Sequence, residues 1–190
     1  DLSRLNETCR MRSNSMQCIG SQAFPRMHYY EWGEPTNPRV LVCVHGLTRN
    51  GRDFDFLAAA LADRFRVICP DVAGRGRSDW LQAKQDYGFA QYLADMAALI
   101  ARVTSGTQQE IYWLGTSMGG LIGLLLAALP GNPIRKLIVN DVGMLVPKIA
   151  LERLARYVGK DPRFATLEAL DAYTRQVSAP FGALSDAQWR

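Results

Sequence analysis

The chain has 190 residues, of which 48% are hydrophobic and 21% charged, and its formal net charge is +4. This balance is typical of a folded domain and excludes wholesale disorder. The arginines are scattered and no aromatic platform lies among them, so we expect no nucleic-acid partner. No apolar stretch reaches the ~18 residues that span a membrane, which argues against a membrane protein.

The first residues are polar and unpatterned, and they lack the apolar core of a signal peptide. We expect residues 1–26 to form a flexible extension that carries Cys9 and Cys18. Cys43 and Cys69 lie inside apolar runs and are expected to be small core residues. The cysteines have no metal-ligand spacing, so we predict no metal site and favour a reducing cytoplasm as the compartment.

Strand patterns and helix patterns alternate along the middle of the chain. After a short strand near residue 27, four apolar runs predict buried strands, and three amphipathic stretches predict helices. The strands are expected at 39–46, 65–72, 110–116 and 135–142, and the helices at 51–63, 89–103 and 118–130. This alternation predicts an α/β fold, a mostly parallel sheet with right-handed crossovers and helices on both faces.

The pattern changes near residue 143. From there to the last residue the sequence has helical periodicity and no strand signal. We therefore expect residues 27–143 to form the core domain and residues 144–190 to form a helical segment that follows it. Neither an internal repeat nor a low-complexity tract interrupts these regions.

The stretch "IYWLGTSMGGLIG" carries Ser117 at the junction of a predicted strand and a predicted helix. Gly115 and Gly119 lie two residues before and two residues after this serine. A turn sharp enough to expose the hydroxyl leaves no space for side chains at these two positions. The turn also places the serine at a helix N-terminus, where N–H groups favour developing negative charge. The pattern predicts a nucleophile, with a plain structural turn as the alternative.

Acyl transfer requires N–H donors directed at the oxyanion of the transition state. We expect one donor from Met118, the residue after the serine, and one from Leu47, in the loop after a buried strand. His45 and Gly46 precede this loop. We interpret His45 as a residue that shapes the loop through hydrogen bonds, rather than as a proton-transfer group.

A second loop, "PDVAGRGRSD", follows the next strand. Its glycines make an incomplete phosphate-loop pattern, so we interpret it as a tight strand-end loop. Trp80, just after it, is expected to form a wall of the substrate pocket. Arg49 and Arg75 are expected at the same end of the sheet. Such arginines commonly tie down backbone carbonyls; the alternative for Arg49 is that it binds a substrate carboxylate.

Together, "VCVHGLTRN", "PDVAGRGRSD" and "GTSMGG" resemble, in order and spacing, the α/β-hydrolase fold family, and the helices after residue 143 resemble the start of its cap. The resemblance implies a serine hydrolase that acts on an ester, a thioester or a carbon–carbon bond next to a carbonyl. It implies an acyl-enzyme on Ser117, a small-molecule substrate and no metal or organic cofactor. Haloalkane dehalogenases share the fold but use an aspartate nucleophile, so Ser117 argues against that branch. The alternative is a non-catalytic protein that binds a small molecule in the same pocket.

A serine nucleophile needs a base within hydrogen-bond reach. The sequence contains only His28 and His45, whereas the family places its histidine after the serine. We expect His28 to be a partly exposed structural residue. The chain is therefore expected to be an incomplete hydrolase, inactive alone, whose base comes from a C-terminal fragment or a second chain; a natural short form is the alternative. Asp141 is either the triad acid or a structural residue that caps the following turn or binds the helical cap.

Overall fold

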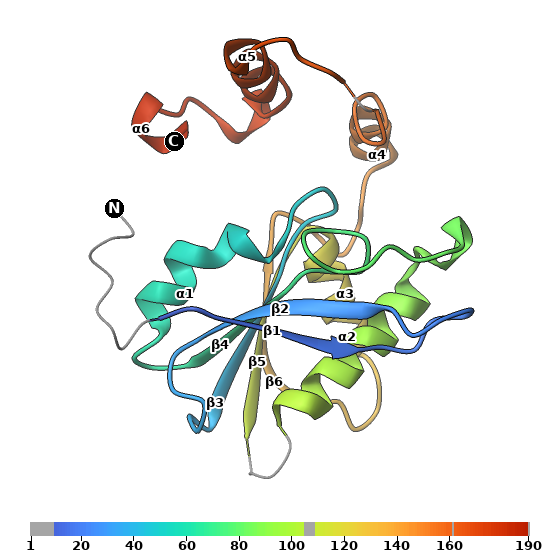
Figure 1. The fold of residues 1–190 in the computed structure, drawn as a ribbon, viewed down its shortest axis with the longest axis vertical. Coiled ribbons are helices and arrows are strands. Elements are labelled where there is room, and N and C mark those ends of the chain that lie inside the picture. Colours follow the sequence, from blue (N-terminus) through green and yellow to red (C-terminus); the bar gives the residue numbers. More distant parts are fainter. Residues whose placement is uncertain (1–9, 105–108, 161, 190) are drawn as a thin grey trace. The chain divides into compact units, whose positions relative to one another are not determined.

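A computed structural model describes residues 10–104, 109–160 and 162–189. The chain divides into two compact units, Asp1–Leu145 and Val146–Arg190, which we describe separately. The first unit contains a six-stranded sheet with helices, and the second is helical (Figure 1). This division lies close to the boundary that the sequence predicts at residue 143.

The sheet of the first unit is mixed and mostly parallel. Its strands are β1 (Arg12–Gln17), β2 (Arg26–Trp32), β3 (Arg39–Val44), β4 (Arg66–Pro70), β5 (Glu110–Thr116) and β6 (Ile134–Asn140). They lie in the order β1-β2-β4-β3-β5-β6. β2 is antiparallel to both of its neighbours, whereas β4, β3, β5 and β6 are parallel. The predicted α/β sheet is confirmed.

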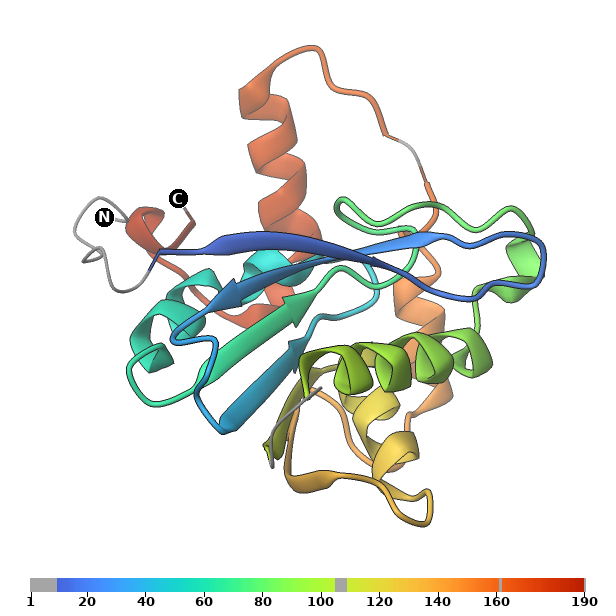
Figure 2. The same ribbon diagram turned by 60° about the horizontal axis from the view of Figure 1, so that its bottom comes forward.

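Helices cover both faces of this sheet, as predicted (Figures 1 and 2). The helices of this unit are η3 (Gly51–Phe54), α1 (Asp55–Leu61), η4 (Lys84–Asp86), α2 (Phe89–Val103) and α3 (Met118–Ala127). On one face, Phe54 and Ala58 share a core cluster with Tyr30, Cys43 and Cys69 of the strands. On the other face, α2 and α3 contribute to a larger cluster. Both strand cysteines are fully buried, which confirms their assignment to the core.

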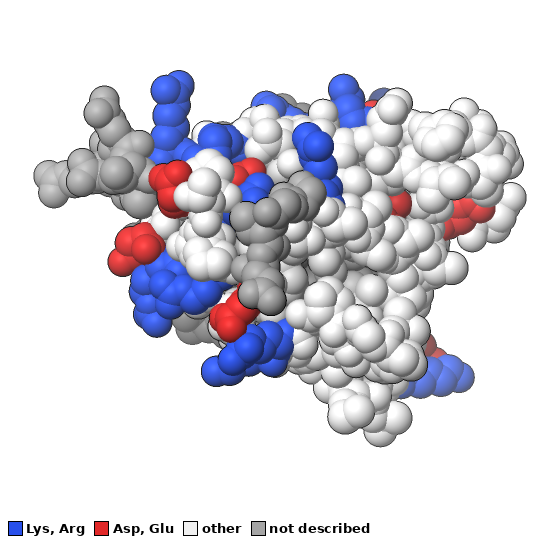
Figure 3. Space-filling model, turned by 90° about the horizontal axis from the view of Figure 1, so that it is seen from below, with Lys and Arg blue, Asp and Glu red and all other residues white. Residues whose placement is uncertain are grey.

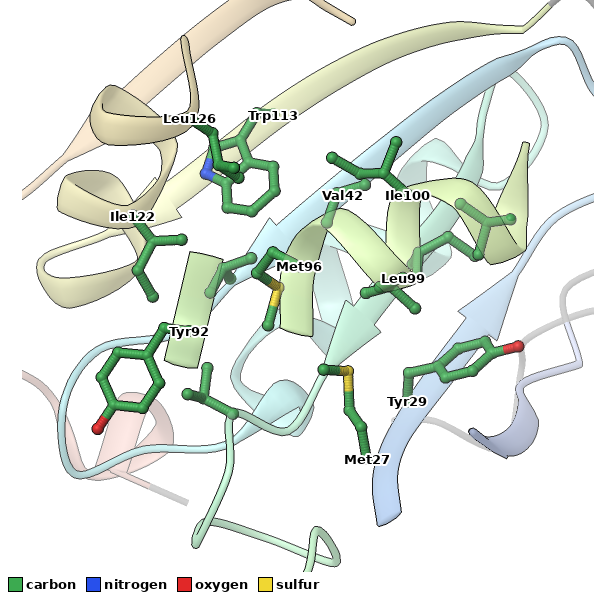
Figure 4. Close-up of a cluster of buried hydrophobic side chains, with 14 of the residues drawn as sticks. Met27, Tyr29, Val42, Tyr92, Met96, Leu99, Ile100, Trp113, Ile122 and Leu126 are labelled. Carbon is green, nitrogen blue, oxygen red and sulfur yellow. The ribbon is translucent and has the colours of Figure 1, made fainter. Parts of the chain in front are cut away.

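The larger cluster fixes where α3 begins. Figure 4 shows Trp113 of β5 beside Ile122 and Leu126 of α3, with Met96 and Leu99 of α2 in the same cluster. The fully buried indole of Trp113 donates its Nε1 hydrogen to the Gly119 carbonyl oxygen, 3.1 Å away. This bond joins β5 to the first turn of α3, the place where the sequence predicts the nucleophile.

The prediction of a flexible extension over residues 1–26 is wrong for the part from residue 12 onward. β1 pairs with β2 in a register that runs from Arg12 opposite Glu31 to Gln17 opposite Arg26. Cys18, at the end of β1, is only 4% exposed because it packs into the larger core cluster. Residues 1–9, with Cys9, lie outside the described residues.

β6 forms the other edge of the sheet. The sequence predicts that this strand is buried on both faces, and this prediction is wrong. All of its residues are partly or fully exposed, and Ile138 is 55% exposed. β5 pairs with one side of β6, and no strand among the described residues pairs with the other side. The N–H and C=O groups on that side, with apolar side chains beside them, are available for pairing.

The second unit is helical, in agreement with the pattern of residues 144–190. It contains α4 (Lys148–Leu154), α5 (Leu167–Val177), η5 (Ala179–Phe181) and α6 (Asp186–Trp189). The side chain of Thr166 caps α5 by accepting the N–H of Ala169. Arg175 of α5 forms ion pairs with Asp171 and with Asp186 of α6, which joins these two helices.

Acidic and basic side chains are mixed on the surface. On the face shown in Figure 3 they lie together over one part, and a broad area carries neither. The expectation that the protein has no nucleic-acid partner stays a prediction. None of the helices that the structure describes combines the length and the apolar character needed to cross a bilayer.

The packing of α2 on the sheet leads to a stability prediction. Leu99 is fully buried in the larger cluster, so Leu99→Ala should lower the free energy of unfolding by about 2–5 kcal/mol. Leu129 is 51% exposed, and Leu129→Ala should change this free energy by about 0.5 kcal/mol or less. Urea titrations followed by circular dichroism measure both values. Equal losses in the two variants would contradict this account of the core.

Candidate active site

Ser117 lies at the junction of β5 and α3 in a strained backbone conformation. Its φ is 50° and its ψ is −113°, a region that residues other than glycine rarely adopt. A Cβ added to Gly115 would lie 2.2 Å from the Gly119 oxygen, and one added to Gly119 would lie 2.0 Å from the Val44 oxygen. Neither position has space for a side chain, which is the reason that the sequence pattern suggested for both glycines.

Backbone hydrogen bonds hold this turn on both sides. The N–H of Ser117 donates to the Asn140 oxygen at the end of β6 (2.8 Å), and the Ser117 oxygen accepts the N–H of Leu121 in α3 (3.0 Å). Met118 is the first residue of α3, and the N–H groups of a first helical turn have no partner within their helix. The Met118 N–H therefore has no partner within α3, and its role as an oxyanion donor stays a prediction.

The loop after β3 comes next to the serine. A Cβ added to Gly46 would lie 3.6 Å from the Ser117 Cβ. The buried ring of His45 accepts the Val72 N–H at Nε2 (3.0 Å), so its hydrogen is on Nδ1, which donates to the Gly46 oxygen (2.7 Å). A trans peptide directs its C=O and N–H to opposite sides. His45 therefore sets the direction of the Leu47 N–H, the predicted second donor.

His45 cannot also act as the base for Ser117. Both of its nitrogens are engaged, and the ring is fully buried. Burial lowers the pKa of His45 below the ordinary value of 6.5, because the charged ring would lose its solvation. Protonation would also place a hydrogen on Nε2, where the Val72 N–H already donates. These contacts agree with the interpretation of His45 as a residue that shapes the loop.

His28 lies on β2, three strands away from β5 in the sheet, which corresponds to about 14 Å. Its Nε2 lies 2.7 Å from the Ser13 hydroxyl, and its Nδ1 lies 3.8 Å from the Asp71 carboxylate. The expectation that His28 is partly exposed is wrong: it is 8% exposed, because the unpredicted strand β1 covers it. Neither histidine of the sequence is placed to take a proton from Ser117.

A buried carboxylate, Asp71, organises the loops at this end of the sheet. Its Oδ1 accepts the Gly51 N–H (2.7 Å) and its Oδ2 accepts the Arg77 N–H (2.8 Å). Gly76 adopts a φ of 54° and packs against the same carboxylate. The stretch "PDVAGRGRSD" is thus a strand-end loop, as interpreted. Sequence reasoning missed Asp71, although an acidic residue at the end of a buried strand is a usable signal.

Arg49 is already paired in the structure. Its Nε donates to both carboxylate oxygens of Asp53 (3.0 and 2.9 Å), and its Nη2 lies 2.8 Å from Oδ1. This pairing favours a role in the scaffold over the alternative of binding a substrate carboxylate.

Trp80 and Asp141 have different surroundings. Trp80 is 80% exposed and lines a surface hollow of about 370 Å³ with residues 20–25, and no residue of the serine turn lines this hollow. The prediction that Trp80 is a wall of the substrate pocket finds no support there.

Asp141 follows β6 with a φ of 55°, one residue after the carbonyl that binds the Ser117 N–H. It lies near the turn, and its role as the acid stays a prediction. Among the described residues, no group of three His, Cys, Asp or Glu side chains is arranged to hold a metal ion.

The family model described as alpha/beta hydrolase fold matches residues 39–184, which include the loop after β3, the serine turn and most of the second unit. The chain belongs to the alpha/beta hydrolase fold family. The resemblance seen in the sequence motifs is thereby confirmed.

Individual members of the family are similar over most of the chain. A 3-hydroxybutyrate-oligomer hydrolase from Cupriavidus necator is 52% identical over 179 residues, which are 94% of this chain and 60% of that protein. A pimeloyl-[acyl-carrier protein] methyl ester esterase from Yersinia pseudotuberculosis is 36% identical over 60% of this chain and 39% of its own length. The crystal structure of an alpha/beta hydrolase from Novosphingobium aromaticivorans superposes with a TM-score of 0.82, at 35% identity, over 95% of this chain and 62% of that one. The chain thus spans three fifths or less of the curated relatives that it matches here.

The buried histidines predict how stability depends on pH. Burial lowers the pKa of both His45 and His28 below 6.5, so below that pH the unfolded state binds protons that the folded state excludes. The free energy of unfolding should therefore fall as the pH decreases from 6.5, by up to about 1.4 kcal/mol per pH unit for each histidine. His45→Gln should flatten this dependence, and His28→Gln should flatten it separately. Urea titrations between pH 7.5 and about pH 5 measure the slopes; a slope in His45→Gln equal to that of the parent chain would contradict the burial of a neutral ring.

Proposed function

We propose that this chain carries the nucleophile and the oxyanion hole of a serine esterase, with Ser117 as the nucleophile. The observation that carries the proposal is the position of Ser117. Its φ of 50° lifts it from the sheet at the N-terminus of α3, directly beside the loop of Gly46 and Leu47. The relatives named as a 3-hydroxybutyrate-oligomer hydrolase and a pimeloyl-[acyl-carrier protein] methyl ester esterase support the same class of reaction.

The mechanism follows from these positions. The Ser117 oxygen attacks the carbonyl carbon of an ester while its proton passes to a base, and the tetrahedral oxyanion accepts hydrogen bonds from the N–H groups of Leu47 and Met118. The base then returns the proton to the leaving alcohol as the ester C–O bond breaks, which leaves an acyl-enzyme. Water, deprotonated by the same base, attacks the acyl group and releases the carboxylic acid and Ser117. Asp141 would orient the base if it serves as the acid.

The base itself must come from outside these 190 residues, because His28 and His45 are engaged elsewhere. We propose that a further segment of polypeptide, or a second chain, supplies the histidine together with strands that continue the sheet from β6. The half-exposed strand β6 and the length of the relatives support this proposal. The chain alone is then expected to be inactive in the absence of an added base.

The substrate class is proposed from the relatives. Since the 3-hydroxybutyrate-oligomer hydrolase is 52% identical over 94% of this chain, we propose a short oligoester of a hydroxy acid as the substrate. A methyl ester or a thioester is the second candidate within the same mechanism. A cytoplasmic location remains a proposal that agrees with the free, buried cysteines Cys18, Cys43 and Cys69.

An added base tests the role of Ser117 in the chain as it stands. Imidazole supplied in solution should take the place of the missing histidine and produce hydrolysis of p-nitrophenyl butyrate that increases with imidazole concentration. After the rate with imidazole alone is subtracted, the rate of the parent chain should be at least about tenfold higher than that of Ser117→Ala. This ratio is smaller than the 10²–10⁴-fold acceleration that a positioned base provides. The rate is followed by the absorbance of p-nitrophenolate.

A matched control is Ser15→Ala, which removes an exposed hydroxyl of β1 and should leave the rate unchanged. In a longer polypeptide with its own base, Ser117→Ala should lower turnover by several orders of magnitude, up to about 10⁶-fold. If Ser117→Ala and the parent chain hydrolyse the ester equally in both settings, the nucleophile assignment is wrong and the binding-protein alternative is favoured.

The open edge of β6 leads to a prediction about association. Unpaired strand edges with apolar side chains self-associate, so the chain alone should form dimers or larger species as its concentration rises. Ile138→Lys, at an exposed position of this edge, should reduce association, whereas Ile149→Lys in α4 should not. Sedimentation velocity over a hundredfold concentration range measures this. A parent chain that stays monomeric throughout would contradict the proposal that β6 requires a partner strand.

A further inference from the structure

One guanidinium contacts both residues that are proposed to form the oxyanion hole. Arg75 lies in the loop after β4, and its Nε donates to the Leu47 carbonyl oxygen at 3.0 Å. Its Nη2 lies 3.9 Å from the sulfur of Met118, at the start of α3. Leu47 and Met118 are 71 positions apart in the sequence, on loops after different strands, and Arg75 bridges them.

The guanidinium is itself held in a fixed position. Its Nη1 donates to the Ala73 oxygen (2.8 Å) and to the Tyr92 hydroxyl of α2 (3.0 Å). The charged group lies over the rings of Tyr87 and Tyr92, with 5.8 and 5.4 Å to the ring centroids. An arginine fork held by several acceptors and two aromatic faces loses less entropy per contact than a free side chain. Arg75 can therefore transmit the position of α2 and of its own loop to the oxyanion loop.

Among the described residues, no carboxylate pairs with the guanidinium of Arg75. Within the described part of the chain, its polar partners are carbonyl oxygens, a hydroxyl and a sulfur, and none of the ion pairs includes it. By contrast, the neighbouring Arg49 is paired with Asp53. A cation without a paired carboxylate is placed next to the loop where the proposed reaction develops a negative charge. Such a charge stabilises an oxyanion more than it stabilises the neutral ester.

From these contacts we propose that Arg75 is a positioning residue of the oxyanion hole, which fixes the Leu47 loop relative to Met118. This inference rests on the proposed function, because it assigns the donors of the same site. Loss of the bridge should leave the fold intact and let the Leu47 loop move. Because the donors act mainly in the transition state, the loss should lower kcat and change KM little.

The kinetic test uses the imidazole-dependent ester hydrolysis of the chain. Arg75→Gln should lower kcat by about 10–10²-fold and should leave KM within about twofold of the parent value. This loss is smaller than the loss of about 10²–10³-fold in kcat that follows deletion of an oxyanion donor itself. Arg75→Lys keeps the charge but loses the planar fork, so its kcat should lie between that of Arg75→Gln and that of the parent chain. Arg77→Gln is the matched control, because its side chain is exposed on the same loop, and it should behave like the parent chain.

A second measurement is independent of catalysis. Amide hydrogen exchange, resolved by NMR, should become at least about tenfold faster at Arg49 in Arg75→Gln, because the Arg49 N–H donates to the Gly46 oxygen (3.2 Å) across the Leu47 loop, while buried strands such as β5 keep their protection. Arg77→Gln should not change the exchange at Arg49. This arm decides the positioning role even if imidazole produces no measurable hydrolysis.

The outcomes separate the two proposals. If Ser117→Ala abolishes the reaction while Arg75→Gln retains the parent kcat and the parent exchange at Arg49, the role of Arg75 is overturned and the esterase proposal stands. If protection falls equally across the whole sheet in Arg75→Gln, Arg75 is a general stabiliser and the positioning role is also overturned. If the Arg49 amide of the Leu47 loop loses protection while the strands keep theirs, but Ser117→Ala does not affect hydrolysis, Arg75 holds the loop and the esterase proposal fails.

Discussion

The whole site depends on a close approach of three backbone segments that leaves no space for side chains. The ends of β3 and β5 come so near to the first turn of α3 that a Cβ at Gly115 or Gly119 would overlap with backbone oxygens. This contact forces Ser117 into its positive φ and places Met118 at the helix N-terminus. Trp113 reinforces the contact through its hydrogen bond to Gly119. A larger residue at either glycine would separate the helix from the sheet and remove the turn.

The loops around this turn are held by buried polar groups rather than by apolar packing. His45 orients the Gly46 peptide, Asp71 joins the loop of Gly51 to the loop of Arg77, and Arg75 reaches from one loop to the next. Loops at the ends of parallel strands have few ladder hydrogen bonds of their own, so such side chains must satisfy their backbone groups. In our proposal, the same groups direct the N–H donors of Leu47 and Met118 toward one point beside Ser117, and such preorganisation is the property that acyl transfer requires.

The two edges of the sheet have opposite characters. β1 covers the edge at β2 with an antiparallel strand whose outward residues are polar, and it buries His28 and Cys18 as it does so. β6 carries apolar residues such as Ile138 at an edge that no described strand covers. In our proposal this second edge is where further strands bring the base. The nucleophile and the base would then lie on separate parts of the polypeptide, and the sheet would join them.

The sequence by itself determined the alternation of strands and helices, the serine turn and the His-Gly loop. These features depend on local rules, namely apolar runs for buried strands, helical periodicity, and glycines at a fixed distance from a serine. The family resemblance followed from the same local motifs. The sequence also showed by itself that no histidine follows Ser117, whereas only the structure shows that His28 and His45 are engaged elsewhere.

Tertiary structure alone decided the remaining features. The polar strand β1 has no apolar run that would reveal it, since an edge strand is stabilised by its partner and not by its own pattern. The exposure of β6 depends on what lies beside it, although its sequence reads as a buried strand. Among the arginines near the loops, only the fold shows that Arg49 is paired with a carboxylate and that Arg75 bridges Leu47 and Met118. The physical reason for β1, β6 and Arg75 is that their surroundings are set by residues far apart in the sequence. The Arg49–Asp53 pair spans only four residues, but no local pattern records which of several similar side chains will meet.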